Sequence, residues 1–375
     1  MMVRPITESA LAALSAFKPD ISEARRRWQA FWQGELIERP LVVVTAPQPV
    51  PAKTMEAPAT LGSSGRGRYY DSIFGNPAET AAGVVAQAAA TYWGGEAVPT
   101  YEPAFGPDQF AAFLGAELYY SPDSDSTSWV KPFVEDWERV LPLTVEGHPW
   151  YERMMLFLRT LSETAAGRVV IGHLDMHGNM DALAAIRGPE QLCLDLMDQP
   201  EVIDRAMASV RSLYPKVYLD VEKASRQDRT GSSCWIPAYC EGRYAVIQCD
   251  FITMISPEMF RRWVGPALEE EAAFLDHCIF HLDGPGALKH LPDILAIKDI
   301  DVIQWVPGAG QPPLPEWIDL LEKIQKAGKG LHISTSPEHI KWFHSRLKPE
   351  KVFYQTRVKT PAEAEELLAW LKRHT

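Results

Sequence analysis

The residues best suited to chemistry are His281 and Asp283, which flank Leu282 in a predominantly apolar segment. Residues i and i+2 of a strand point to the same face, so the two side chains would project together. A neutral imidazole and a carboxylate at this spacing can share a divalent metal such as zinc, or they can act as an acid–base couple. A buried hydrogen bond that only stiffens the strand is the alternative. We predict a catalytic or ligand role, with both residues as candidate metal ligands.

Further polar residues stand at the ends of other predicted strands. Asp175 and His177 repeat the i, i+2 spacing, although a glycine follows at once, and they either bind substrate or stabilise a loop. We assign catalytic roles to Asp175 and Glu241, in addition to His281 and Asp283. The candidates for substrate binding are His177, Tyr239, Gln304, Trp305, His332, Tyr354, Gln355 and Arg357. Neighbours on a strand point to opposite faces, so at most one of Gln304 and Trp305 reaches the site, and core packing is favoured for Trp305.

These residues share one location only if the strands that carry them are parallel neighbours. Apolar runs at 41–46, 97–101, 168–174, 233–239, 278–283, 301–306, 330–334 and 351–355 alternate with helical patterns. Ser256-Pro257, Ser336-Pro337 and Thr360-Pro361 each place a capping hydroxyl before a proline, as at helix starts. Strands that alternate with helices indicate a parallel sheet. Eight of them predict closure into a (β/α)8, or TIM, barrel, whose active site is formed at the C-terminal ends of the strands.

The chain is interpreted as one α/β domain over residues 1–375. A barrel of about 250 residues reaches this length through insertions, and one long insertion, roughly residues 102–166, separates the second and third predicted strands. A lid over the site and a surface for a homodimer are the two roles considered for it. A doubly wound sheet is disfavoured because no GxGxxG follows the first strand and no GxxxxGK[ST] is present.

The composition excludes several functional classes. The formal net charge is -12 and no stretch is strongly basic, which argues against a nucleic-acid partner. The sequence contains no window of about 18 uninterrupted apolar residues, so no membrane span is predicted. The five cysteines are odd in number and show no CxxC spacing, so we expect free thiols and a cytoplasmic location. A small molecule is the expected substrate.

Three segments carry recognisable family signatures. Residues 181–190 read DALAAIRGPE and are followed by Asp195-Leu196 and by DQPE at 198–201. Residues 248–260, with ISPEMF at 255–260, and residues 31–40, with Arg39 and Pro40, resemble two further signatures. Together these segments resemble the uroporphyrinogen decarboxylase (URO-D) superfamily. The resemblance keeps its order over most of the chain, and it implies a URO-D-like TIM barrel.

Two branches of that superfamily use the barrel differently, and the sequence favours one of them. The decarboxylase branch places an arginine-rich MRQAGRY motif directly after its first strand, because guanidinium groups grip the carboxylates of the substrate. Here the first strand continues into Ala46-Pro47-Gln48-Pro49 without an arginine, and Gly67-Arg68-Tyr69-Tyr70 echoes the motif only later. The resemblance therefore favours the other branch, the corrinoid-dependent methyltransferases.

The methyltransferase branch implies a metal site. It binds zinc through a His-x-Cys pair after a late strand and a distant cysteine. His281 matches the histidine, Asp283 stands in place of the first cysteine, and residues 354–359 contain no cysteine. We therefore expect a methyltransferase-like enzyme that acts on a small methylated substrate or with a corrinoid protein as partner, and a divalent metal such as zinc. A decarboxylase or other lyase, and a ligand-binding barrel without catalysis, are the alternatives.

Overall fold

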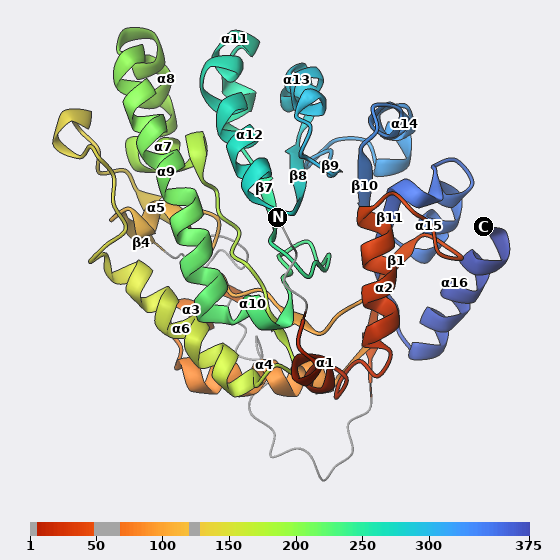
Figure 1. Ribbon diagram of the computed structural model, residues 1–375. Coiled ribbons are helices and arrows are strands. Elements are labelled where there is room, and N and C mark those ends of the chain that lie inside the picture. Colours follow the sequence, from red (N-terminus) through yellow and green to blue (C-terminus); the bar gives the residue numbers. More distant parts are fainter. Residues whose placement is uncertain (1–5, 49–67, 120–127) are drawn as a thin grey trace.

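Parallel strands form the middle of the molecule, and helices lie along their outer side (Figure 1). The structure is a computed structural model that describes residues 6–48, 68–119 and 128–375. Its strands are β1 (Leu41–Pro47), β2 (Thr91–Gly95), β3 (Thr100–Tyr101), β4 (Glu117–Tyr119), β5 (Trp129–Lys131), β6 (Val170–Ile171), β7 (Tyr244–Gln248), β8 (His277–Asp283), β9 (Val302–Val306), β10 (Gly330–Ser334) and β11 (Val352–Arg357).

Seven of these strands form the main sheet. Their order is β2-β1-β11-β10-β9-β8-β7, and all neighbours pair in parallel except β2, which is antiparallel to β1. A separate parallel pair joins β3 to β6, and an antiparallel pair joins β4 to β5. The predicted α/β class with a central parallel sheet is therefore confirmed. The assigned ladders leave β2 and β7 as the two edges of the main sheet.

The helices follow the strands in alternation over the C-terminal half of the chain. The α-helices are α1 (Glu8–Leu14), α2 (Ile21–Trp32), α3 (Arg68–Phe74), α4 (Pro77–Ala89), α5 (Gln109–Phe113), α6 (Pro149–Ala165), α7 (Asn179–Arg187), α8 (Pro189–Asp198), α9 (Pro200–Ser225), α10 (Gln227–Thr230), α11 (Pro257–Met259), α12 (Gly265–Phe274), α13 (Leu291–Ala296), α14 (Ile318–Lys326), α15 (Pro337–His344) and α16 (Pro361–His374). Short 3-10 turns include η2 (Trp137–Arg139), η3 (Asp250–Met254), η5 (Pro285–His290), η6 (Leu314–Trp317) and η7 (Pro349–Lys351), and η4 (Phe260–Val264) is a π-helical turn. The hydroxyls of Ser256, Ser336 and Thr360 cap α11, α15 and α16 as predicted.

Most of the predicted strands are confirmed within a few residues, and one is wrong. The runs at 41–46, 278–283, 301–306, 330–334 and 351–355 become β1, β8, β9, β10 and β11, while those at 97–101 and 168–174 shorten to β3 and β6. The run at 233–239 contains no strand, and only an isolated bridge joins Ser232 to Cys240. Pro237 has no N–H to donate to a ladder. The strand of this region is β7, five wholly buried residues beginning at Tyr244.

Alternating side chains divide the main sheet into an inner and an outer side. On the inner side, Ile279, Val302 and Phe353 form one buried cluster with Trp28 and Phe31 of α2. On the outer side, the residues between them in sequence pack against the covering helices in a larger cluster. Parallel strands buried on both sides require apolar residues at nearly every position. Because α2 occupies one end of the inner side, polar side chains gather at the opposite, C-terminal end of the strands.

The predicted insertion at 102–166 contains several helices and strands. It includes α5, β4, β5 and η2, and it ends in α6, which packs beside α4 and α9 as part of the outer helix layer. Its role as a lid or dimer surface stays a prediction. The Gly67 of the late arginine motif lies outside the described residues, and Arg68 begins α3.

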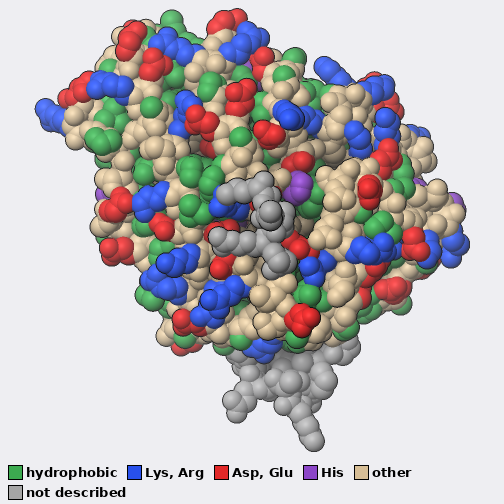
Figure 2. Space-filling view, viewed as in Figure 1, with side chains coloured by type: hydrophobic (Ala, Val, Ile, Leu, Met, Phe, Trp, Pro, Cys, Tyr) green, Lys and Arg blue, Asp and Glu red, His purple; other side chains and the backbone are tan. Residues whose placement is uncertain are grey.

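Two further observations concern the surface and the thiols. No helix in the described ranges is long and apolar enough to cross a membrane. All five cysteines are described and unpaired, and four of them are buried. Figure 2 shows acidic and basic side chains interspersed over the visible face, without one continuous basic area.

Candidate active site

Inward-facing polar residues lie at one level across neighbouring parallel strands. The pairing aligns Gln248 of β7 with His281 of β8, His281 with Gln304 of β9, and Gln304 with His332 of β10. Residues that are partners in the register point to the same side of the sheet. These four side chains therefore form a polar belt, located above the apolar inner cluster and toward the C-terminal ends of the strands.

A candidate metal centre lies directly beyond this belt. Asp250, at the start of η3, is two residues past Gln248, and Asp283 is two residues past His281. One ligand atom from each of Asp250, His281 and Asp283 can be chosen so that all three lie within 4.8 Å of one another. Carboxylate oxygen and imidazole nitrogen are ligands of zinc and of other divalent transition metals. The predicted pair His281 and Asp283 thus gains Asp250 as a third candidate ligand.

The three candidate ligands have open ligand atoms. The Nδ1 atom of His281 lies 2.6 Å from the Oε1 atom of Gln304, which leaves its Nε2 atom available. Within the described ranges, we find no hydrogen bond to the carboxylates of Asp250 or Asp283. Their oxygens are therefore free to bind a cation or a substrate. Trp235 lies beside this group, with its ring centroid 5.1 Å from that of His281 and its buried Nε1–H without a partner among the described residues.

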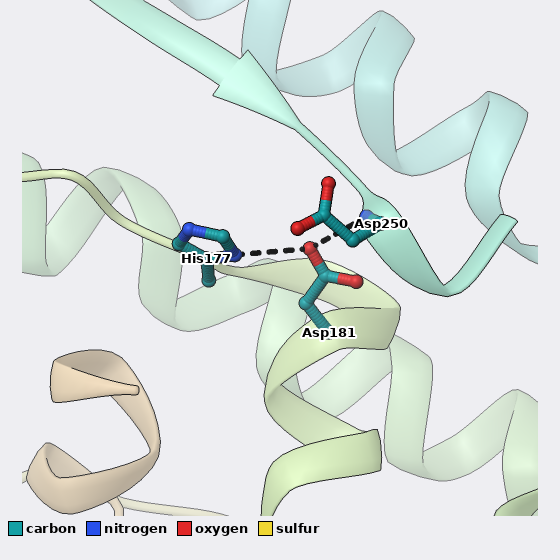
Figure 3. A group of neighbouring side chains, drawn as sticks. All are labelled: His177, Asp181 and Asp250. Atoms are coloured by element: carbon teal, nitrogen blue, oxygen red, sulfur yellow. Dashed lines mark hydrogen bonds and ion pairs between the residues drawn. The ribbon is translucent and has the colours of Figure 1, made fainter. Parts of the chain in front are cut away.

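A second group next to the candidate metal centre consists of His177, Asp181 and Asp250 (Figure 3). Asp181 lies in the first turn of α7, and its carboxylate accepts hydrogen bonds from the backbone N–H groups of Asp250 at 3.0 Å and Phe251 at 2.9 Å. The two ring nitrogens of His177 are each 3.3 Å from a carboxylate oxygen, one of Asp175 and one of Asp181. Hydrogen bonds therefore already engage the polar atoms of His177 and Asp181.

The electrostatics of the second group favour a charged histidine. Burial lowers the pKa of His177, but the carboxylates of Asp175 and Asp181 outweigh it and raise this pKa well above its usual value. Burial raises the pKa of Asp181. His177 and the backbone N–H groups lower this pKa by more than burial raises it, so the net shift is downward. His177 is therefore held between two carboxylates that stabilise its charged form. These contacts organise the loop after β6.

Asp250 belongs to both groups and differs from the carboxylates of Asp175 and Asp181, which contact His177. The side chain of Asp250 is accessible to solvent, although surrounding protein atoms remove part of its hydration. Burial and the neighbouring Asp181 raise its pKa to about 6. Negative charge in this region is therefore incompletely compensated, and a bound cation would relieve the repulsion.

The structure brings several predicted site residues together. Asp175 and His177 adjoin the candidate metal centre through Gln248, whose Nε2 atom lies 2.7 Å from Asp175 Oδ1 and 2.5 Å from His177 Nε2. Gln304, His332 and Gln355 continue the polar belt on the other side of His281. Arg357 is exposed at the end of β11, next to Thr45 in the register.

Two predicted binding residues face away from the site. Trp305 is almost fully buried on the outer side, where its ring packs at 5.0 Å from that of Trp317. Tyr354 is completely buried in the same outer cluster. Both neighbour an inward residue on their strand, so the alternation that directs Gln304 and Gln355 inward directs these two outward. The prediction that Tyr354 lines the mouth is wrong, and the core role favoured for Trp305 is confirmed.

The placement of Tyr239 and Glu241 near the site is also wrong. The Nε1–H of Trp32 in α2 donates to the carbonyl of Tyr239, and the Trp32 ring stacks on His277 at the beginning of β8. Glu241 pairs with Arg25 of the same helix. His281 and Asp283 lie at the far end of β8, roughly 13–20 Å from His277 at about 3.3 Å per residue. The cause is the false strand at 233–239, which made Glu241 follow a C-terminal strand end.

Three residues of the site were missed from the sequence. Asp250 and Gln248 belong to the unrecognised strand β7, although the run YAVIQ followed by Cys-Asp has the pattern of a buried strand ending in a polar residue. Asp181 was noted only within a family signature. No sequence pattern indicated that its carboxylate would bond to the backbone at Asp250.

A buried polar contact supports the site from behind. Asn179, at the start of α7 with a left-handed φ of 48, donates to Glu271 Oε1 and to the backbone carbonyl of Gln248, both at 3.1 Å. Asparagine tolerates this backbone region better than most residues. Burial raises the pKa of Glu271 to about 8, so this carboxyl is largely protonated at neutral pH. Glu271 therefore fixes α7 to α12 as a neutral group.

Comparisons with known proteins support the fold and leave the activity open. No protein-family model matches the chain, and no curated protein matches its sequence. A solved structure described as a methyltransferase from Methanosarcina mazei has a similar fold, with a TM-score of 0.59, 12% sequence identity, and coverage of 94% of this chain and 98% of that chain. At this identity the likeness shows the fold alone. It agrees with the methyltransferase-type fold that the resemblance implied, and it does not bear on the URO-D superfamily as such.

The protonation of Glu271 gives a prediction for stability. An unfolded glutamate ionises near 4.5 and the folded one near 8, so between these values the folded chain holds a proton that the unfolded chain has lost. The contribution of Glu271 to stability is complete at low pH and falls as pH rises to about 8. Glu271→Gln keeps an acceptor for Asn179 and removes the ionisation. The free energy of unfolding of the variant should exceed that of the wild type by a few kcal/mol at about pH 8.5 and by little at about pH 5, because one pKa unit corresponds to about 1.4 kcal/mol. Urea unfolding at both pH values measures this, and an equal difference at the two would contradict it.

Proposed function

We propose that this protein is a methyltransferase-like enzyme that depends on a divalent metal such as zinc, held by Asp250, His281 and Asp283. The observation that carries the metal is the set of three open ligand atoms at the ends of β7 and β8. This end of parallel strands is where barrel enzymes place their active sites. The methyltransferase reaction is supported by the sequence resemblance and by the fold of the Methanosarcina mazei methyltransferase.

The ligand set distinguishes this site from a thiolate site. Cys249 is next to Asp250, but its thiol lies 3.4 Å from the Asp181 carboxylate. Cys278 is on the same strand as His281, and its thiol is directed to the carbonyl of Asp299. A metal held by oxygen and nitrogen acts as a Lewis acid that polarises a bound group. Thiolate ligands suit the activation of a thiol acceptor, and their absence from this group favours a different acceptor.

The residues around the candidate metal centre have separate roles in this proposal. Asp250, His281 and Asp283 would hold the metal, and His177 with Asp175 forms a fixed pair beside it. Trp235 offers an unused N–H donor next to His281. The substrate is a small methylated compound. A corrinoid protein is the proposed partner for the methyl group, and the insertion at 102–166 is the proposed lid or homodimer surface, both inferred from the sequence.

The closed barrel is part of the same proposal. Two hydrogen bonds lie beyond the assigned strands: Gly172 N–H donates to the Tyr101 carbonyl at 2.7 Å and extends the β3–β6 pair, and His173 N–H donates to the Ser233 carbonyl at 2.6 Å. These contacts place the 230–240 segment beside β6. An experimental structure with this segment between β6 and β7 would support a closed eight-stranded arrangement, and an open gap there would contradict it.

Metal binding is the first test of the function. Purified wild-type protein should bind one divalent metal per chain. His281→Ala, Asp283→Asn and Asp250→Asn should each lower Zn²⁺ affinity by at least about tenfold, since loss of even an indirect ligand contact costs this much. Asp293→Asn changes a half-buried aspartate that is paired with Arg261; it is the control and should bind as the wild type does. Elemental analysis and chelator competition measure the metal content and the affinity. Unchanged Zn²⁺ affinity in all three site variants would contradict the proposed metal centre.

Two activity assays separate methyl transfer from decarboxylation. The metal-loaded wild type should form methylcobalamin from cob(I)alamin and a small methylated donor, and Asp283→Asn should not. Uroporphyrinogen III should remain unconverted, because Asp175, Asp250 and Asp283 repel a polycarboxylate at close range. Absorbance follows the first reaction and porphyrin analysis the second. Coproporphyrinogen as a product would favour the decarboxylase instead.

A further inference from the structure

A chain of hydrogen bonds crosses the inner side of the sheet from His281 to Gln355. The Nδ1 atom of His281 is 2.6 Å from Gln304 Oε1, and Gln304 Nε2 is 3.0 Å from His332 Nδ1. The Nε2 atom of His332 is 3.0 Å from Gln355 Oε1. Each member comes from a different strand, β8 to β11. The strand register brings His281, Gln304 and His332 to one level, and Gln355 lies two residues past Phe353, the register partner of His332.

The donors and acceptors of this chain determine which nitrogen of each imidazole carries a proton. A carboxamide oxygen can only accept, and a carboxamide nitrogen can only donate. Gln355 therefore accepts from His332 Nε2–H, which leaves the lone pair of His332 Nδ1 to accept from Gln304. Gln304 Oε1 in turn accepts from His281 Nδ1–H. Every link agrees with a neutral His332, and burial, which lowers the pKa of His332 to about 3, keeps it neutral.

We propose that Gln304 and His332 are positioning residues that hold His281 in the tautomer with a proton on Nδ1 and a lone pair on Nε2. This inference rests on the proposed metal centre, because an imidazole binds a metal only through a nitrogen that carries no proton. A second-layer partner that fixes the tautomer of a histidine ligand also fixes its ring orientation. The substrate-binding roles expected for Gln304 and His332 are replaced by this one.

The remote member of the chain makes the inference specific. His332 does not touch His281, yet it provides the acceptor that orients the Gln304 amide. If both amides were reversed together, Gln304 would donate to His281 Nδ1, and the His281 proton would move to Nε2. The lone pair would then be lost from the metal side. A residue that only filled space at position 332 would leave the Gln304 amide free to adopt this second arrangement.

Packing alone does not account for His332. Its side chain is 3% exposed and stacks at 4.7 Å on Phe353, a member of the apolar inner cluster. An aliphatic side chain would fill this volume without removing a polar ring from water, which is costly unless the polar atoms are bonded. Both ring nitrogens are bonded, and both bonds belong to the chain that ends on His281.

Zn²⁺ affinity of full-length variants tests the proposal. Gln304→Leu and His332→Leu should each weaken Zn²⁺ binding by about 10–100-fold. Gln304→Glu keeps an acceptor for His281 Nδ1–H and should bind at least as tightly as the wild type. The matched control is Gln325→Leu, which removes a glutamine that is 4% exposed and bonds to the Lys348 and Lys351 carbonyls away from the site. Its affinity should equal that of the wild type. Equal affinities in Gln304→Leu, His332→Leu and Gln325→Leu would overturn the proposal.

The tautomer itself provides a readout that a structural role would not change. Long-range ¹H–¹⁵N spectra of metal-free protein distinguish Nδ1–H from Nε2–H, and the His281 signals are those absent from His281→Ala. The wild type should show the Nδ1–H tautomer at His281, and His332→Leu should show a mixture or the other form. A wild-type Nε2–H tautomer would overturn the inference. If the wild type binds no Zn²⁺, the metal centre fails, while the spectra still decide the positioning role independently.

Discussion

The register between the parallel strands β7 to β11 is the constraint on which the whole site depends. It sets Gln248, His281, Gln304 and His332 at the same level on the same side of the sheet. A shift of one residue in any strand would direct its polar side chain into the outer helix layer. The apolar neighbours of these residues are buried there, so the outer core that stabilises the sheet also fixes the orientation of the inner polar belt. Stability and function are thus linked through one geometric feature.

Much of this arrangement could be predicted from sequence because alternation is a local property. The i, i+2 spacing of His281 and Asp283 is sufficient to place both on one face, and the same rule separates Gln304 from Trp305. The site was predicted incompletely where this rule lacked a correct strand. Apolar residues at 233–239 resembled a strand, yet Pro237 interrupts any ladder, and β7 follows later in the chain. Asp250 and Gln248 were therefore missed, and Glu241 was placed at the wrong end of the molecule.

The remaining part of the site depends on contacts between segments distant in sequence, which no local pattern encodes. Asp181 on α7 accepts backbone hydrogen bonds at the start of η3, and this holds Asp250 beside it. Asp175 and Asp181 flank His177, whereas the carboxylate of Asp250 has a raised pKa. The carboxylates are therefore divided into a group that is bonded to His177 and organises the loop, and an open group suited to a cation. This division follows from geometry, and the residue types alone do not show it.

A polar belt inside an otherwise apolar sheet is expensive, and this cost is informative about its purpose. Each buried amide or imidazole loses hydration that only a well-formed hydrogen bond restores. Every side-chain hydrogen bond of Gln304 and His332 belongs to the one hydrogen-bond chain that ends on His281. The cost is therefore best explained by what the chain does to the exposed nitrogen at its end, where the open carboxylates of Asp250 and Asp283 also lie.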